Sequence, residues 1–287
     1  MANLKEIRNR IASIGSTMQI TSAMKMVSAA KLKKAQDAIT AMRPYSNKLT
    51  ELLQNLSATL DGEIGGAYTK SRKVEKVLLV VISSNRGLCG SFNSALVKET
   101  TKLIKENYSN KDVYLLTIGK KADDILSKNF KVIENNNAVF DKLTFDNVAK
   151  IADQLMQYYT EEKFDKIELI YNKFKNAATQ IVTTETFLPI VQKKRNDNNA
   201  VKDYIFEPSK VEIVEALIPK SLKTQLYKAL RDSFAAEHGA RMTAMHKATD
   251  NASELRDELL LQYNKARQAA ITNEILEIVG GAEALKG

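Results

Sequence analysis

The chain has 287 residues, of which 27% are charged, with a formal net charge of +9 and a single cysteine. That length allows one or two domains, and no apolar run is long enough to span a bilayer. The lone cysteine excludes a disulfide within the chain and indicates a reducing compartment. Arg8, Arg10 and Lys25 interrupt any apolar leader, so we expect no signal peptide, and Glu6 argues against a transit peptide.

Residues 1–60 are predicted to form one long helix. Apolar side chains recur at alternating steps of three and four, which is typical of a narrow helical seam: Leu4, Ile7, Ile11, Ile14, Met18, Met24, Val27, Leu32, Ala35, Ile39, Met42, Tyr45, Leu49, Leu52, Leu56 and Leu60. The segment carries nine Lys or Arg against three Asp or Glu. Such a basic helix indicates an acidic partner, such as nucleic acid or an acidic protein surface. A solvated helix face is the alternative.

The segment 70–200 is predicted to form a small Rossmann-like α/β domain. It follows a polar, glycine-bearing break at 61–66. The runs 76–82 and 113–118 are apolar throughout, which is typical of strands buried on both faces of a parallel sheet. Helices ending near 107 and containing 148–158 would cover the faces of that sheet.

Three weaker strands complete the predicted sheet. We expect one at 130–133 and a hairpin that joins 167–171 to 179–188 across a turn at 172–176. The polar stretch 192–201 is expected to be an exposed loop.

Residues 208–287 are predicted to form a second long helix. Its apolar positions again alternate by three and four: Leu222, Leu226, Leu230, Phe234, Met242, Met245, Ala252, Leu255, Leu259, Tyr263, Ala266 and Ala270. A helix over 221–287 would be roughly 100 Å long, so it needs a partner outside a compact domain. We expect the two terminal helices to wrap on each other as a left-handed antiparallel coiled coil.

The turn at 83–93 is the one enzyme-like stretch. It follows a buried strand and opens a helix, where backbone N–H groups can hold a phosphate. It lacks the glycine patterns of nucleotide-binding turns, so we expect a structural turn that needs Gly87 and Gly90. A nucleotide site is the alternative.

No other constellation predicts chemistry. Cys89 is expected to be a packed thiol, not a nucleophile. His238 and His246 would lie roughly 12 Å apart along a helix, too far to share a metal. We therefore expect no catalytic residue, no cofactor and no metal.

A length mismatch between the two helices predicts a bare end. If Leu56 lies opposite about Lys210, then Met1 lies opposite about Arg267, and about twenty residues of the C-terminal helix have no partner. That overhang is apolar nearly all the way round: Ala269, Ala270, Ile271, Ile275, Leu276, Ile278, Val279, Ala282, Ala284 and Leu285. Such a surface would aggregate in water, so we expect it to enter a socket made by other chains. A frayed tail is the alternative.

Several blocks of the sequence resemble the gamma subunit of F-type ATP synthases of the bacterial type. They are Lys-Glu-Ile-Arg at 5–8, Ala-Met-Lys-Met-Val-Ser-Ala-Ala-Lys-Leu at 23–32, Arg-Gly-Leu-Cys-Gly at 86–90, Ala-Thr-Asp-Asn-Ala-Ser-Glu-Leu at 248–255, Tyr-Asn-Lys-Ala-Arg-Gln-Ala-Ala-Ile-Thr at 263–272, and Glu274-Ile275 with Ile278-Val279. The resemblance spans the whole chain.

The resemblance implies a non-catalytic rotor shaft. Its terminal helices would turn inside a hexamer of alpha and beta subunits, and its α/β domain would contact the epsilon subunit and the c-ring. It would couple ion translocation to ATP synthesis and hydrolysis, with nucleotides bound in the hexamer. The implied localisation is peripheral on the cytoplasmic side of the bacterial plasma (inner) membrane.

The resemblance also implies contact residues. Arg267, Gln268 and Thr272 match family positions that contact the beta subunits. Met24 and Lys25 match the part of the shaft near the lever segments of the beta subunits. Ile275 and Ile278 of the apolar overhang complete the expected hexamer contacts.

Two other functions fit the pattern less well. A coiled-coil adaptor with a nucleotide-binding α/β domain would have to bind a nucleotide as an isolated chain. A nucleic-acid adaptor would bind in a salt-dependent way, but the basic residues are not interleaved with aromatic ones, so we expect no nucleic-acid partner.

Overall fold

The computed structural model describes residues 4–58, 68–70, 72–190 and 210–284. The chain forms two compact units, one of Met1–Ser28 with Met242–Gly287 and one of Ala29–Arg241. The long helices α1 (Leu4–Ala58) and α5 (Lys210–Ala284) each contribute to both units. The two predicted terminal helices are therefore confirmed. The predicted break at 61–66 and polar loop at 192–201 fall in stretches that the structure does not describe.

The larger unit is built on a five-stranded sheet in the order β3-β2-β1-β4-β5. Strands β1 (Lys76–Ile82), β2 (Asp112–Ile118), β3 (Lys131–Asn135) and β4 (Lys166–Phe174) are parallel, and β5 (Gln180–Leu188) runs antiparallel to β4. The central strand β1 is buried from Val77 to Ile82, as its unbroken apolar run predicts. The predicted parallel sheet with an antiparallel hairpin is confirmed.

The hairpin turns later than predicted. Asn172 lies inside β4 and is buried. Its side-chain amide is satisfied there, since it donates to the Phe92 backbone carbonyl at 3.2 Å. A buried amide with a partner can continue a strand, whereas an unpaired one would favour a turn. The residue type at position 172 alone does not distinguish a strand position from a turn position.

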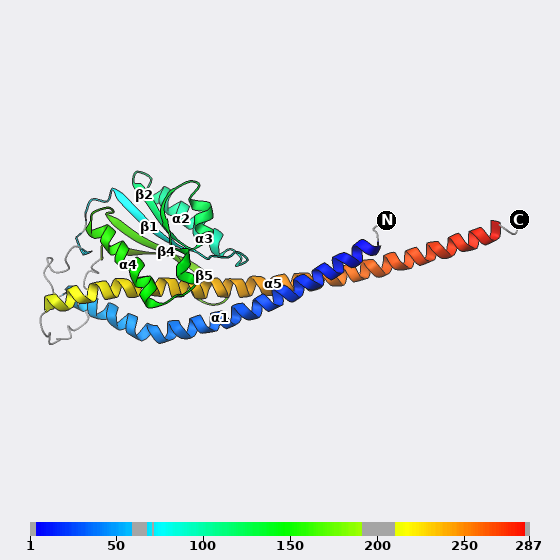
Figure 1. Ribbon diagram of the computed structural model, residues 1–287, viewed down its shortest axis with the longest axis horizontal. Helices are drawn as coiled ribbons and strands as arrows, with labels where there is room; N and C mark the ends of the chain where they lie inside the picture. Colours follow the sequence, from blue (N-terminus) through cyan, green and yellow to red (C-terminus); the bar gives the residue numbers. More distant parts are fainter. Residues whose placement is uncertain (1–3, 59–67, 71, 191–209, 285–287) are drawn as a thin grey trace. The chain divides into compact units, whose positions relative to one another are not determined.

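Helices cover both faces of the sheet (Figure 1). Helices α2 (Phe92–Asn107) and α3 (Lys120–Leu126) pack on the face that carries Val77, Leu79 and Val81. Helix α4 (Phe145–Thr160) and the first part of α5 pack on the face that carries Leu78, Val80 and Ile82. The alternation follows from the strand period of two. The 3₁₀ turn η2 (Asn137–Phe140) lies between β3 and α4.

The apolar face of the first part of α5 packs against a different surface from the one predicted. Leu222, Leu226 and Leu230 belong to the core beneath the sheet, together with residues of α4. The sequence assigns them to the coiled-coil seam. Apolar spacing identifies a buried helix face, but it does not identify what covers that face.

The smaller unit pairs the start of α1 with the end of α5. Arg8 Nη2 donates to the Tyr263 hydroxyl at 2.8 Å, and Thr249 Oγ1 donates to Thr21 Oγ1 at 2.8 Å. Because the residue numbers rise on one helix as they fall on the other, the pair is antiparallel, as predicted. This register places Leu4 opposite about Arg267, so the predicted alignment of Met1 with Arg267 is wrong by about three residues.

The seam of α1 passes through small polar residues that sequence reasoning left out. Thr21 and Ser28 are buried, whereas Val27, assigned to the seam, is 56% exposed. Thr21 and Ser28 each donate a hydroxyl hydrogen to a carbonyl of their own helix, at Met18 and Met24. A hydroxyl satisfied in this way can occupy a close helix contact. On α5, Leu255 also faces outward.

Candidate partner-binding surface

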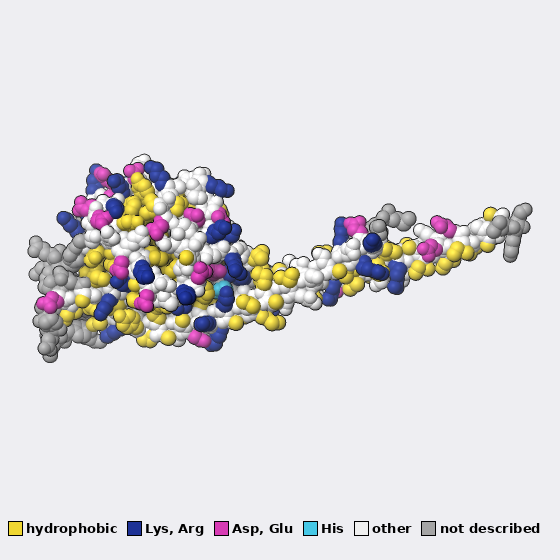
Figure 2. Space-filling view, viewed as in Figure 1, with side chains coloured by type: hydrophobic (Ala, Val, Ile, Leu, Met, Phe, Trp, Pro, Cys, Tyr) yellow, Lys and Arg dark blue, Asp and Glu magenta, His cyan; other side chains and the backbone are white. Residues whose placement is uncertain are grey.

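The end of α5 is bare. Every described side chain from Ile271 to Ala284 is exposed, and Ala270 is the last that is partly covered. The large apolar side chains of this tip are Ile271, Ile275, Leu276, Ile278 and Val279, the most open being Ile278 at 70% exposed. Figure 2 shows hydrophobic side chains along this part of the molecule. The predicted apolar overhang is confirmed, and a run of exposed apolar side chains of this kind indicates a protein interaction surface.

The charged residues of the tip are all acidic. Residues 271–284 contain Glu274, Glu277 and Glu283 but no Lys or Arg. At about 100° per residue, Glu274 and Glu277 lie on one side of the helix, and Leu276 and Val279 lie on the opposite side. The tip therefore presents different chemistry in different directions around its axis.

The predicted contact residues form two separate groups. Arg267, Gln268, Thr272, Ile275 and Ile278 all lie exposed on the last turns of α5. The Thr272 hydroxyl donates to the Gln268 carbonyl at 2.9 Å, so it needs no outside partner.

Met24 and Lys25 are half-buried on α1. The register puts Lys25 opposite about Met245, roughly 30 Å along the helix pair from Arg267. The structure does not bring the two groups together.

An exposed apolar patch beside Met24 escaped sequence reasoning. Ile20, Met26 and Val27 are more than half exposed. Ile20 and Val27 are seven residues apart and so share one helix face. The predicted seam contains Val27 but not Ile20 or Met26, so the apolar pattern alone does not show that the three side chains face outward together.

The carboxyl edge of the sheet is occupied by the chain itself. In open α/β sheets, ligands bind at the carboxyl ends of the strands where the strand order reverses, which here is beside β1 and β4. The turn after β1 and a stretch of α5 close this edge, with Cys89 and Phe92 packed against Ala236 and Ala240. The structural interpretation of the turn at 83–93 is thereby supported over a nucleotide site.

Only one of the two glycines predicted to shape this turn has the expected conformation. Gly90 has a φ of 59°, in the left-handed region. Leu88, not Gly87, is the other left-handed residue, with a φ of 61°. A Cβ added at Gly87 would meet no atom within 4 Å.

Cys89 is a packed thiol, as predicted. Its side chain is buried, and Asn93 Nδ2 lies 3.2 Å from Sγ. Burial raises the pKa of the Cys89 thiol, outweighing the opposing effect of its contact with Ser84. A thiol held protonated in this way is a poor nucleophile.

The two histidines have different environments. His246 is exposed beside Asp250, with Nδ1 3.2 Å from the carboxylate. His238 is buried, and burial, reinforced by the charges of Arg241 and Lys31, lowers its pKa to about 3. Among the residues that the structure describes, no three His, Cys, Asp or Glu side chains group as metal ligands. None of the described helices could cross a membrane.

A family model described as ATP synthase matches residues 3–285 of this chain. The chain is 72% identical over 287 residues to the ATP synthase gamma chain of Flavobacterium johnsoniae, covering all of both chains. It is 45% identical over 288 residues to the ATP synthase gamma chain of Geotalea daltonii, again over the full length of both.

Solved structures agree with the fold. A chain of the Tetrahymena thermophila mitochondrial ATP synthase central stalk and c-ring matches with a TM-score of 0.60 and 29% identity, covering 80% of this chain and 99% of that one. A chain of the Euglena gracilis mitochondrial ATP synthase, in a structure of OSCP, F1 and c-ring, matches with a TM-score of 0.68 and 20% identity, covering 98% and 94%.

Proposed function

Because this chain belongs to the family of ATP synthase gamma chains, we propose that it is the central rotor shaft of an ATP synthase. It couples ion translocation through the membrane ring to ATP synthesis and hydrolysis in the alpha/beta hexamer. The observation that carries this proposal is the bare apolar tip at 271–284, on a helix whose partner covers it only as far as Ala270.

The tip suits a shaft that turns inside a sleeve. A single helix is not symmetric, so at any moment its Leu276–Val279 side and its Glu274–Glu277 side meet different subunits of a ring. Rotation then changes which subunit meets which surface, and differential contacts bias each subunit's conformation. The coupling needs packing and charge contacts but no bond chemistry on this chain.

The non-catalytic role is supported by the filled carboxyl edge of the sheet. Arg241 and the alanines of α5 pack at the carboxyl edge of the sheet, which is where open α/β sheets bind ligands. In this proposal the nucleotides bind in the hexamer and the chain itself carries no catalytic residue or cofactor.

The contacts are divided between the two groups of residues. The part of the hexamer sleeve around the α5 tip contacts Arg267, Gln268, Thr272, Ile275 and Ile278. The lever segments of the beta subunits contact Met24 and Lys25, further from the tip. The segments 1–60 and 208–287 act as the shaft and 70–200 as the foot. The foot contacts the epsilon subunit and the c-ring.

The chain is a peripheral part of a membrane-bound complex. We assign it to the cytoplasmic side of the plasma (inner) membrane, as expected for a bacterial enzyme of this type. No nucleic-acid partner is part of the proposal.

Affinity purification of the tagged full-length chain from solubilised membranes tests the proposal. The alpha, beta, epsilon and c subunits should co-purify in one complex that hydrolyses ATP. Recovery of the folded chain without alpha and beta would contradict it.

A further inference from the structure

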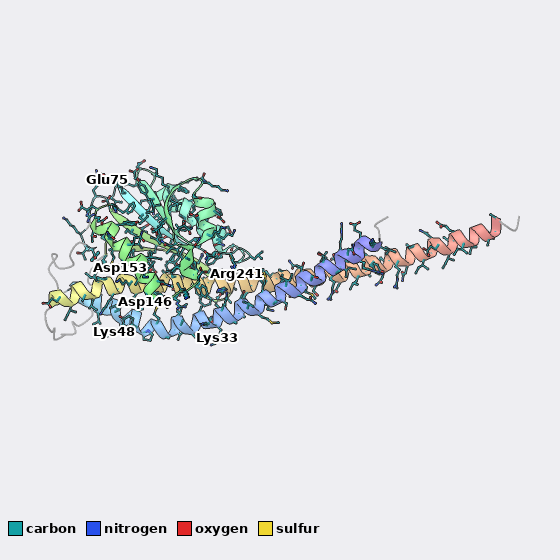
Figure 3. All side chains as sticks on the ribbon, in the orientation of Figure 1. Lys33, Lys48, Glu75, Asp146, Asp153 and Arg241 are labelled. Carbon is teal, nitrogen blue, oxygen red and sulfur yellow. The ribbon has the colours of Figure 1, made fainter. Side chains whose placement is uncertain are left out.

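A buried polar cluster joins α5 to the turn after β1, at the carboxyl edge of the sheet. Arg241 is 7% exposed, and its Nη1 lies 2.6 Å from the Glu237 carboxylate. Its Nη2 donates to the Arg86 carbonyl at 3.1 Å and to the Gly87 carbonyl at 3.2 Å. Figure 3 labels Arg241 on α5 beside the α/β domain. One guanidinium thus connects the helix to the turn that follows β1.

The turn that receives Arg241 is itself anchored in the sheet. Ser83 N–H donates to the Ile118 carbonyl at the end of β2, at 2.8 Å, and Lys121 N–H donates to the Ser84 carbonyl at 3.0 Å. Asn93 of α2 accepts from the Ser84 N–H at 3.1 Å. A force applied to the turn therefore reaches two strands and two helices.

The surface of α5 around Arg241 consists largely of small residues. Ala235, Ala236 and Ala240 are buried here, and a Cβ added to Gly239 would lie 3.2 Å from Ala177 Cα. Small side chains let the helix approach the domain closely, so the Arg241 guanidinium reaches the carbonyls of the turn.

Arg241 is also the last residue of α5 that belongs to the larger unit, since the smaller unit begins at Met242. The helix continues without a break past this point. We propose that the Arg241–Glu237 pair and the carbonyls of Arg86 and Gly87 form a torsional anchor, through which the α/β domain turns α5 under load. This inference rests on the rotor function proposed above and assigns Arg241 and Glu237 as positioning residues.

Membrane vesicles containing the assembled ATP synthase provide the test. ATP-driven ion uptake per ATP hydrolysed is compared with ATP hydrolysis by the hexamer and this chain detached from the membrane ring, where the shaft turns without load. Arg241→Lys keeps the charge but has one nitrogen in place of the two that bond the carboxylate and the carbonyls. Glu237→Gln leaves the carbonyl bonds and removes the charge pair.

For both variants, ion uptake per ATP should fall by roughly threefold or more, while unloaded hydrolysis stays within about twofold of wild type. Arg231→Lys is the matched control, because Arg231 Nη2 also donates to a domain carbonyl, that of Leu143 at 2.9 Å, but lies ten residues earlier on α5. It should leave uptake per ATP unchanged, because the Arg241 cluster, which lies nearer the loaded end of α5, is intact in this variant.

Equal uptake per ATP in wild type and both variants, with this chain present in the complex, would overturn the anchor and leave the rotor function standing. Loss of both variants from the complex would also overturn it, because the cluster would then serve folding and not load. If the wild-type chain itself does not assemble with alpha and beta subunits, the rotor function fails instead.

Discussion

Thr249 Oγ1 donates a hydrogen bond to Thr21 Oγ1 at 2.8 Å, although the two residues are 228 positions apart in the chain. Thr249 also donates toward the Met245 carbonyl at 2.8 Å, so its hydroxyl hydrogen is shared between the two acceptors. Together with the Arg8–Tyr263 contact, this pair fixes the direction and the register of the two terminal helices. Where that register ends determines which part of α5 is bare.

The Thr21–Thr249 pair predicts an efficient disulfide. The 2.8 Å contact between the two hydroxyl oxygens shows that the side chains point at each other across the helix pair, as the two cysteines of a disulfide must. Thr21→Cys with Thr249→Cys should cross-link under mild oxidation and show a mobility shift on a non-reducing gel. The control pair, Thr21→Cys with Leu255→Cys, should stay reduced, since Leu255 faces outward. Cross-linking of the control pair in preference to the first would contradict the register.

The bare tip predicts that two charge substitutions separate stability from assembly. Ile275→Asp with Ile278→Asp places charge on the exposed apolar face. Each isoleucine that a socket buries contributes about 1.5–3 kcal/mol, so retention in the complex should fall by about tenfold or more. The isolated chain should unfold within about 0.5 kcal/mol of wild type, because neither side chain packs within the chain.

Asn273→Asp is the matched control for the tip. It adds a negative charge to an exposed residue of the same turns without removing apolar area. Retention close to wild type is expected, as measured by quantitative gel analysis of the purified complex. Full retention of the double isoleucine variant would show that the tip is not held by a socket.

The burial of Cys89 predicts slow thiol chemistry. Because burial raises the pKa of Cys89, little thiolate forms near pH 8 and reagents reach it only when the structure opens. Reaction with an aromatic disulfide reagent should be about a hundredfold slower in the native chain than in denaturant. As the sole cysteine, Cys89 makes this a single-site measurement. A native rate equal to the denatured rate would contradict its placement.

The buried His238 predicts a loss of stability in acid. Its pKa of about 3 in the folded chain lies below the ordinary value of about 6.5. The unfolded chain therefore binds a proton that the folded chain excludes, and stability falls as the pH drops from about 6.5 towards 3. The unfolding constant should rise about tenfold per pH unit in this window from this group alone.

His238→Gln should flatten that part of the profile, as measured by denaturant unfolding at about pH 7 and about pH 5. The neighbouring charged groups Glu237, Arg241 and Lys31 remain in the variant. His246→Gln, at an exposed position, is the control and should retain the wild-type slope. An unchanged slope in His238→Gln would mean that the histidine is not buried in solution.

Much of this fold follows from the sequence because its signals are local. The run Lys76–Ile82 has no polar interruption after its first residue, so it predicts a central buried strand wherever the rest of the sheet lies. The bare tip follows from helix lengths alone. The sequence does not predict Thr21 and Ser28 in the seam, because an apolar pattern cannot show that a small hydroxyl residue bonds its own helix and faces the partner.

The contacts that sequence reasoning missed are long-range. Arg241 meets the Gly87 carbonyl across 154 residues, and no spacing rule connects them. The sequence places Asn172 in the hairpin turn. This prediction is wrong because the partner that lets Asn172 stay in the strand, the Phe92 carbonyl, is 80 residues away. Leu222 was assigned to the wrong interface because its apolar stripe fits either a helix or a sheet.

Rotation of a single complex tests the central claim most directly. The alpha/beta hexamer is fixed to a surface, and a bead is attached to the exposed α/β domain through Lys128→Cys in a Cys89→Ser background. The bead should turn in one direction when ATP is added and stop when ATP is removed. A bead that stays still while the same complexes hydrolyse ATP would contradict the rotor function.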